Sequence, residues 1–289
     1  MKDTILAPAK VNLYLDVLSR REDGYHEIES VMQSISLCDK VSINIEKSSD
    51  LQISIDGTSE SIAWDEKNLA YKACVLFLNE AKTSNYKIDI FVEKNIPISA
   101  GMAGGSTDAG AVLLLLNRAF GEPFSKEELC TLGARIGADV PFCILGGTCL
   151  CKGIGDSLVP LKAFKDKLLV CAIDKSSVST PVAYSMLDKK YGTSASCSSN
   201  LDAFLTYVEN DNLNGVSSSL FNKFESVIIP ENTSILKIKE LLLKNGALGA
   251  LMSGSGPSVF GVFENENDQK RAFDALQNEK IQAFLCKTL

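Results

Sequence analysis

A glycine-rich segment at residues 97–108, PISAGMAGGSTD, most constrains what this chain can fold into. Alternating apolar residues at 88–92 predict a β-strand before it, and an apolar run predicts a helix after it, from Ser106 or Thr107 to about Phe120. Glycines at a strand-to-helix turn let backbone amides approach a ligand, and the helix N-terminus favours an anion at the same point. We therefore expect a phosphate site here; a tight turn with an ordinary serine cap is the competing interpretation.

Two familiar nucleotide-binding loops do not fit this segment. It lacks the Gly-Lys-Ser/Thr ending of a P-loop, and its glycines do not have the spacing of a Rossmann loop. Three glycines, Gly101, Gly104 and Gly105, precede two hydroxyl residues. Because a plain turn needs only one glycine, this set favours the phosphate site.

Composition and charge argue against several classes of protein. The 289 residues include 29 Lys and Arg against 36 Asp and Glu, a net charge of −7, which argues against non-specific nucleic-acid binding. No apolar run approaches the roughly 18 residues that span a bilayer, and the first residues show no signal region. We therefore expect a cytoplasmic protein, a monomer or weak dimer, that acts on a small molecule without nucleic-acid or membrane partners.

Cysteine and histidine usage points away from disulfides and metal sites. The nine cysteines are scattered, and the only tight pair, Cys149 and Cys151, lies in an apolar run. We expect reduced cysteines that act as small hydrophobes. His26 is the only histidine, which removes most histidine-based metal sites and triads, and we expect no metal ligands among the side chains.

The hydrophobic periodicity divides the chain into two halves. In the first half it predicts strands at 11–17, 41–46 and 51–56, the last two joined as a hairpin, a helix at 68–81, a short helix after Asp139 and a strand at 148–152. Ser125 and Glu128 form a capping box that starts another helix. The turn-like residues 153–160 predict a domain boundary, with domains at 1–156 and 157–289.

The second half shows the order strand, helix, strand, strand, helix, strand, which matches the split β-α-β plan. These elements are expected at 168–173, 234–244, 248–252, 259–263, 268–277 and 281–286. A further helix is expected from residue 181, and the serine-rich residues 192–200 are expected to form a loop.

Four further segments carry residues that could be functional, and each has a plain structural explanation. Asp139, in GADVPF, is more often a helix N-cap than a catalytic base. Lys10, at the start of a half-buried strand, is usually a solvated edge charge. His26 follows Tyr25 and a glycine turn, so it is either a surface residue or part of a platform for stacking a base. The glycine-rich residues 251–258 are a hairpin loop on spacing alone.

Taken together, these segments resemble the GHMP kinase superfamily, whose three motifs appear in order at residues 8–16, 97–108 and 253–256. Residues 7–16, 21–26 and 137–141 together are similar to the branch that phosphorylates a cytidyl-carrying sugar alcohol, and the DGYH element at 23–26 is absent from homoserine and mevalonate kinases. The resemblance implies an α+β, two-domain GHMP kinase fold. It has an N-terminal mixed α/β domain, a C-terminal split β-α-β (ferredoxin-like) domain and a cleft between them.

The same resemblance implies a reaction and its catalytic residues. ATP, with Mg²⁺ expected, would phosphorylate the 2-hydroxyl of 4-(cytidine 5′-diphospho)-2-C-methyl-D-erythritol in the non-mevalonate isoprenoid precursor pathway. Asp139 would take the proton from that hydroxyl. Lys10 would contact this aspartate and the reacting oxygens.

Binding residues are implied in the same way. Asn12 would orient the erythritol and its phosphates, and Tyr25, His26 and Tyr184 would form the cytidine pocket, with His26 bonding the base. Lys94 and Asn68 would lie near the adenine. The residues around the ATP phosphates would be Pro97, Ile98, Ser99, Ala100, Gly101, Met102, Ala103, Gly104, Gly105, Ser106 and Thr107. Ala100 and Ala103 stand where some relatives have glycine, which narrows backbone freedom but keeps the side chains small.

Two alternatives remain open at this point. A GHMP kinase with another small-molecule acceptor would share the loops but not the Tyr25-His26 element. A non-catalytic nucleotide-binding member would keep the fold without the reaction, although the presence of Lys10 and Asp139 counts against it.

Overall fold

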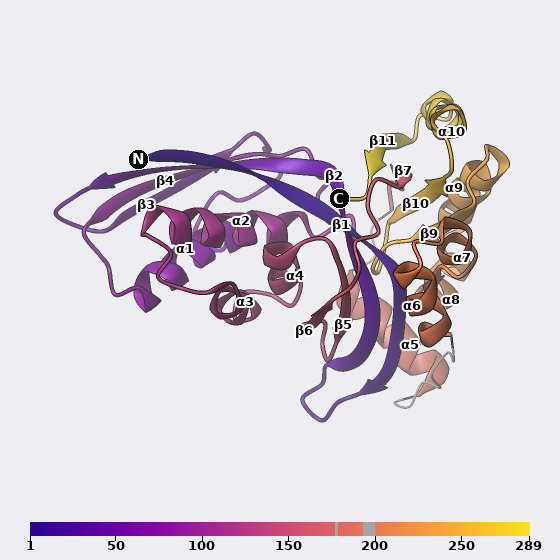
Figure 1. Cartoon of the computed structure of the whole chain (residues 1–289), viewed down its shortest axis with the longest axis horizontal. Helices are drawn as coiled ribbons and strands as arrows, with labels where there is room; N and C mark the ends of the chain where they lie inside the picture. The colour runs from indigo at the N-terminus through magenta and orange to yellow at the C-terminus, as the bar shows by residue number, and fades with distance from the viewer. Residues whose placement is uncertain (177–178, 193–199) are drawn as a thin grey trace. The chain divides into compact units, whose positions relative to one another are not determined.

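The computed structural model describes residues 1–176, 179–192 and 200–289 (Figure 1). These residues form two compact units, and each unit is assembled from three separate segments of the chain. The first unit comprises Met1–Ala9, Leu37–Ile98 and Ala103–Gly146, and the second comprises Lys10–Ser36, Ser99–Met102 and Gly147–Leu289. Because the units are interleaved along the chain, they do not test a single boundary. The predicted boundary after residue 156 therefore stays a prediction.

Two long strands, β1 (Lys2–Arg20) and β2 (His26–Lys47), contribute to both units. The first unit adds β3 (Gln52–Gly57), α1 (Leu69–Glu80), β4 (Tyr86–Glu93), α2 (Gly104–Ala119), α3 (Lys126–Ala134) and α4 (Val140–Leu145). The second unit adds β5 (Thr148–Lys152), β6 (Ser157–Pro160), β7 (Leu168–Ile173), α5 (Thr180–Tyr191), α6 (Leu201–Glu209), α7 (Leu213–Ser218), β8 (Phe221–Asn222), α8 (Glu225–Glu231), α9 (Thr233–Lys244), β9 (Gly249–Met252), β10 (Ser258–Phe263), α10 (Glu266–Asn278) and β11 (Gln282–Lys287).

The sheet of the first unit corrects the predicted hairpin. β2 and β3 do not pair with each other, because β4 lies between them: it pairs antiparallel with β2, Ile43 opposite Ile90, and parallel with β3, Ile55 opposite Ile90. β4 alternates buried Ile88, Ile90 and Val92 with more exposed residues, as expected for a central strand with one face on the core.

Helices α1 and α2 pack on one face of this sheet (Figure 1). Phe77 and Cys74 of α1 and Val112 and Leu116 of α2 are fully buried in one apolar cluster with the strand residues. The predicted capping box is confirmed at the start of α3, where the Ser125 side chain and the Glu128 side chain each bond the other's backbone N–H.

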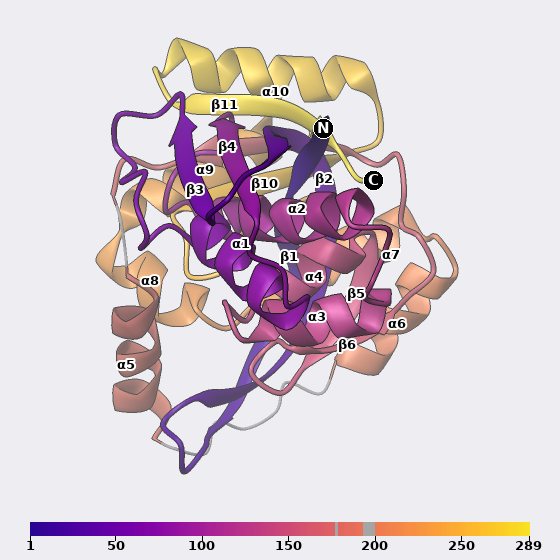
Figure 2. The same cartoon turned by 90° about the vertical axis from the view of Figure 1, so that its left-hand side faces the viewer.

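The second unit contains the predicted split β-α-β arrangement. Its four-stranded antiparallel sheet has the order β11-β7-β10-β9, and the first strand in sequence pairs with the third and the fourth. Helices α9 and α10 bury Ile238, Leu242, Ala272 and Leu276 against this sheet, and α10 runs alongside β11 (Figure 2). The sequence order of six elements therefore corresponds to one folded motif.

The periodicity missed several elements of the second unit, namely β6, β8 and helices α6 to α8. They are short: β8 has two residues, parallel to β1 with Tyr14 opposite Phe221, and α7 has six. Segments of this length carry too few turns for a periodic signal. Residues 193–199, most of the predicted serine-rich loop, lie outside the described residues.

The eight cysteines of the described residues are free and buried or half-buried, which confirms the prediction for them; Cys197 lies outside that part of the chain. Burial raises the pKa of the Cys74 thiol to about 12, so this group stays an inert thiol. None of the helices that the structure describes is long and apolar enough to cross a bilayer.

Candidate functional site

Lys10 is buried, with 4% of its surface exposed, so the interpretation of it as a solvated edge charge is wrong. Its ammonium donates to Oδ1 of Asn12 at 2.7 Å. The Asn12 amide nitrogen donates to the Ser30 hydroxyl at 2.8 Å, and that hydroxyl donates to the Tyr14 carbonyl at 2.7 Å. Because each group accepts from one neighbour and donates to the next, the orientation of the Asn12 amide is determined.

The side chain of Ser253, in the glycine-rich segment 251–258, bonds both β1 and the glycine-rich segment 97–108. Its hydroxyl accepts from the backbone N–H of Asn12 at 3.3 Å and donates to the carbonyl of Gly101 at 3.2 Å. The backbone N–H of Lys10 donates to the Met102 carbonyl at 3.1 Å. Within the second unit, the structure therefore brings together residues from all three motifs that the sequence places up to 241 positions apart.

Gly101 lies at φ +72°, and a Cβ built on it would be 2.4 Å from the Ser253 carbonyl oxygen. This is a position that only glycine can occupy without displacement of the neighbouring loop. Residues 253–256 connect antiparallel β9 and β10, which confirms the hairpin interpretation of that segment.

Asn222 holds the Ser253 loop from the other side, and the sequence analysis missed it. Its amide nitrogen donates to the carbonyls of Met252 at 2.6 Å and Gly254 at 2.8 Å, while its oxygen accepts from the Phe224 N–H at 3.0 Å. Asn222 belongs to no motif, and its hydrogen bonds are to a loop about 30 residues away, so local sequence gives no sign of its role.

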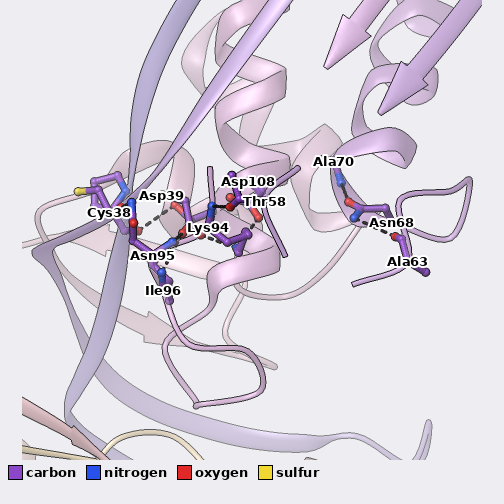
Figure 3. A network of polar contacts seen from close by, with 12 residues as sticks. Cys38, Asp39, Thr58, Ala63, Asn68, Ala70, Lys94, Asn95, Ile96 and Asp108 are labelled. Atoms are coloured by element: carbon purple, nitrogen blue, oxygen red, sulfur yellow. Dashed lines mark hydrogen bonds and ion pairs between the residues drawn. The ribbon is translucent and has the colours of Figure 1, made fainter. Parts of the chain in front are cut away.

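In the first unit, Lys94 lies between two carboxylates (Figure 3). Its ammonium bonds Asp39 and, at 2.6 Å, Oδ2 of Asp108, and all three side chains are at least nine-tenths buried. Asp39 also accepts from the backbone N–H groups of Asn95 at 2.6 Å and Ile96 at 2.8 Å. The ammonium is thus committed to this triad, and contact between Lys94 and adenine stays a prediction.

Asp108 is the carboxyl group of the triad whose ionisation is disfavoured by burial. Burial raises its pKa from 3.8 to about 7, against the lowering effect of Lys94, and the nearby Asp39 carboxylate raises it further. Its Oδ1 is buried and has no hydrogen-bond partner among the described residues. Two carboxylates with one ammonium leave one excess negative charge, which favours protonation of Asp108.

Helix α2 begins at Gly104, two or three residues earlier than expected, and its N-cap Ala103 lies at φ +60° without a side-chain cap. The serine-cap interpretation is therefore wrong. Thr107 instead donates to the Pro8 carbonyl at 2.8 Å. A Cβ on Gly104 would lie 3.4 Å from the Lys94 ammonium, so the ion-pair triad lies directly against the first residue of the helix.

Two other predicted residues lie at helix starts in the same unit. Asn68 is the N-cap of α1, where its side chain accepts from the Ala70 N–H at 2.9 Å. Asp139 occupies the N-cap position of α4, but its side chain makes no cap hydrogen bond. The cap role that the residues alone favoured for Asp139 is therefore wrong.

Tyr25, His26 and Tyr184 line one cavity of about 470 Å³ in the second unit. The rings of His26 and Tyr184 are stacked, 4.5 Å apart and 18° from parallel. Tyr25 is 61% exposed, whereas His26 is 9% exposed and bonds Asp188, so His26 is not a surface residue. A wide cavity with two aromatic side chains and a histidine is suited to a planar heterocycle.

Comparisons with known proteins agree with these features. Family models described as "GHMP kinases N terminal domain" and "GHMP kinases C terminal" match residues 68–147 and 195–282. A 4-diphosphocytidyl-2-C-methyl-D-erythritol kinase of Clostridium perfringens (strain SM101 / Type A) is 44% identical over 94% of this chain and 93% of the relative. One from Clostridium novyi (strain NT) is 42% identical over 98% and 99%.

A solved structure of a 4-(cytidine 5′-diphospho)-2C-methyl-D-erythritol kinase is 30% identical and superposes with a TM-score of 0.81 over 99% of both chains. The chain belongs to this family of GHMP kinases. A homoserine kinase from Cytophaga hutchinsonii shares the fold, with a TM-score of 0.77 at 16% identity over 100% of this chain and 94% of that one.

The GHMP kinase motifs contain most of the predicted site residues, but not the residues that hydrogen-bond to them. Ser30, Asn222 and Asp188 lie outside every motif, and they bond the motif residues Asn12, Gly254 and His26, respectively. Asp39 bonds Lys94, which lies three residues before the glycine-rich segment. Only a contact map could have found them.

We predict that Gly101→Ala lowers the free energy of unfolding by about 1–3 kcal/mol, the range for a strained backbone position, and raises the KM for ATP. The cause is the positive φ together with the close Ser253 carbonyl. Chemical denaturation and steady-state kinetics measure the two effects. Gly105→Ala is the matched control, because its Cβ would meet only Leu69 at 3.6 Å within a helix, so stability should be unchanged or higher. Equal losses of stability in both variants would contradict the special requirement for glycine at position 101.

We also predict that stability falls with rising pH around neutrality because of Asp108. Its folded-state pKa, about 7, lies above the ordinary value of 3.8, so its stabilising contribution is present at low pH and is lost as the pH rises through 7. Between pH 6 and pH 8 the loss of stability should be on the order of 1 kcal/mol, and Asp108→Asn should remove that part of the slope. Urea unfolding at both pH values tests this. The exposed Asp50→Asn should keep the full slope; an unchanged slope in Asp108→Asn would disprove the assignment.

Proposed function

We propose that this chain transfers the γ-phosphoryl group of ATP to the 2-hydroxyl of 4-(cytidine 5′-diphospho)-2-C-methyl-D-erythritol, in the non-mevalonate route to isoprenoid precursors. The observation that carries the proposal is the cavity lined by Tyr25, His26 and Tyr184, because these are the residues expected to bind cytidine. The relatives at 42–44% identity bear the name of this kinase.

Cytidine would be bound mainly by stacking and by hydrogen bonding with His26. Stacking of a base on an aromatic ring contributes on the order of 1–3 kcal/mol in nucleic-acid complexes. Asn12 would orient the erythritol phosphates, and its fixed amide makes that contact specific.

ATP is the co-substrate of kinases of this family, and residues 97–107 together with the N-terminus of α2 would hold its phosphates. Backbone amides at a helix N-terminus attract anions. We expect Mg²⁺ to arrive with ATP. The described residues contain no cluster of three or more His, Cys, Asp or Glu side chains that could hold a metal ion.

The catalytic roles follow from the loose transition state of phosphoryl transfer, in which positioning and charge stabilisation do most of the work. Asp139 would accept the proton of the substrate hydroxyl. Lys10, held by Asn12, would stabilise the negative charge of the transferring group. We further propose that the enzyme acts in the cytoplasm as a monomer or weak dimer, without nucleic-acid or membrane partners.

The decisive experiment is steady-state phosphorylation with identification of the product by mass. We expect transfer from ATP to the cytidyl substrate and none to homoserine or mevalonate. Transfer to one of those acceptors would replace the proposed substrate. ATP binding without transfer to any acceptor would identify a non-catalytic member of the family.

We predict that Asp139→Asn lowers kcat by at least about a hundredfold, the low end for loss of a general base, with the KM for ATP nearly unchanged. Asp202→Asn, the same change in the first turn of α6, is the matched control and should retain full activity. Near-normal turnover of the Asp139 variant would remove this residue from the mechanism.

A further inference from the structure

Asp188 lies in the same cavity as His26 and has no assigned role. Oδ1 of Asp188 lies 2.7 Å from Nε2 of His26, and its other oxygen lies 3.4 Å from a guanidinium nitrogen of Arg20. All three residues line the cavity of about 470 Å³. Asp188 is on α5, one turn after Tyr184, so one helix supplies both the ring that stacks on His26 and the carboxylate that bonds it.

This arrangement determines where the imidazole carries its proton. An ionised carboxylate can only accept hydrogen bonds, so the short contact with Asp188 requires a hydrogen on Nε2. In the neutral ring the other nitrogen, Nδ1, then has a lone pair and accepts. Tyr184 stacks on the ring and restricts its rotation, which keeps the direction of that lone pair constant.

We propose that Asp188 is a specificity-determining positioning residue, which makes His26 select pyrimidines that carry an amino group. The inference rests on the proposed function, because it takes the base to bind in this cavity. The 4-amino group of cytosine can donate to Nδ1. The 4-oxo group of uracil has only lone pairs there, so a uracil base would leave two acceptors facing each other.

Asp188→Asn changes this relation without changing the size of the side chain. An asparagine amide can donate to Nε2, which moves the ring hydrogen to Nδ1 and turns Nδ1 into a donor. The variant should therefore tolerate the 4-oxo group of uracil. Asp188→Glu keeps a carboxylate and should retain the preference for cytosine.

The ring tautomer can be measured directly, because His26 is the only histidine in the chain. In untagged protein at alkaline pH, ¹⁵N–¹H NMR correlation of the imidazole should show a protonated Nε2 and an unprotonated Nδ1. Asp188→Asn should shift the populations toward the Nδ1–H form. A wild-type ring with the hydrogen on Nδ1 would overturn the proposal.

Selectivity is measured by calorimetry with CDP and UDP, in the presence of a saturating non-hydrolysable ATP analogue that fills the ATP site. We expect wild-type protein to prefer CDP by at least about tenfold, a modest value for a site that matches hydrogen bonds to its ligand. Asp188→Asn should reduce the preference to about threefold or less. Asp202→Asn, an exposed aspartate on α6, is the charge-matched control and should leave the preference unchanged.

The outcomes separate this proposal from the function on which it rests. If Asp188→Asn weakens CDP and UDP equally and keeps their ratio, Asp188 is only structural and the proposal fails. If wild-type protein binds neither nucleotide beside the ATP analogue, the cytidine pocket itself is wrong, and the phosphorylation assay will show no transfer to the cytidyl substrate.

Discussion

The burial of the Lys10 ammonium is the constraint on which the motif cluster of the second unit depends. An unpaired ammonium in a protein interior costs several kcal/mol, so the fold must supply oriented oxygen atoms around it. Asn12 supplies one, and its orientation depends on Ser30 and in turn on a backbone carbonyl of β1. Ser253 then bonds the same strand and the tip of the glycine-rich loop. The buried ammonium of Lys10 thus lies among hydrogen bonds that join segments from the beginning, middle and end of the sequence.

The first unit solves a related problem in a different way. Lys94 is bonded by two carboxylates, so the triad carries an excess negative charge, and burial together with the Asp39 carboxylate raises the pKa of Asp108. The triad contacts Gly104, the first residue of the helix expected to face the ATP phosphates. The protonation state of Asp108 therefore changes the net charge next to the N-terminus of that helix.

Local patterns predicted much of this molecule, and non-local pairing explains what they missed. Alternation located the six elements of the split β-α-β motif, and glycine content located the phosphate loop. The hairpin of 41–46 and 51–56 was wrong because proximity in sequence favours direct pairing, whereas β4 offered both strands a more apolar partner. The contact of Asn12 with Ser253 spans 241 residues and that of His26 with Asp188 spans 162, which no window of sequence contains.

The interleaving of the two units has a consequence for synthesis on the ribosome. Residues 10–36 emerge early, but they belong to a unit whose remaining part includes the C-terminus. Asn12 meets Ser253 only after 241 further residues have been made, which takes roughly 10–50 seconds at elongation rates of about 5–20 residues per second. During that interval β1 and β2 can pair with each other, but β1 lacks its other neighbour, β8, until residues 221–222 have been made. Completion of the second unit therefore waits for late segments of the chain, and chaperones that shield unpaired strand edges should assist it.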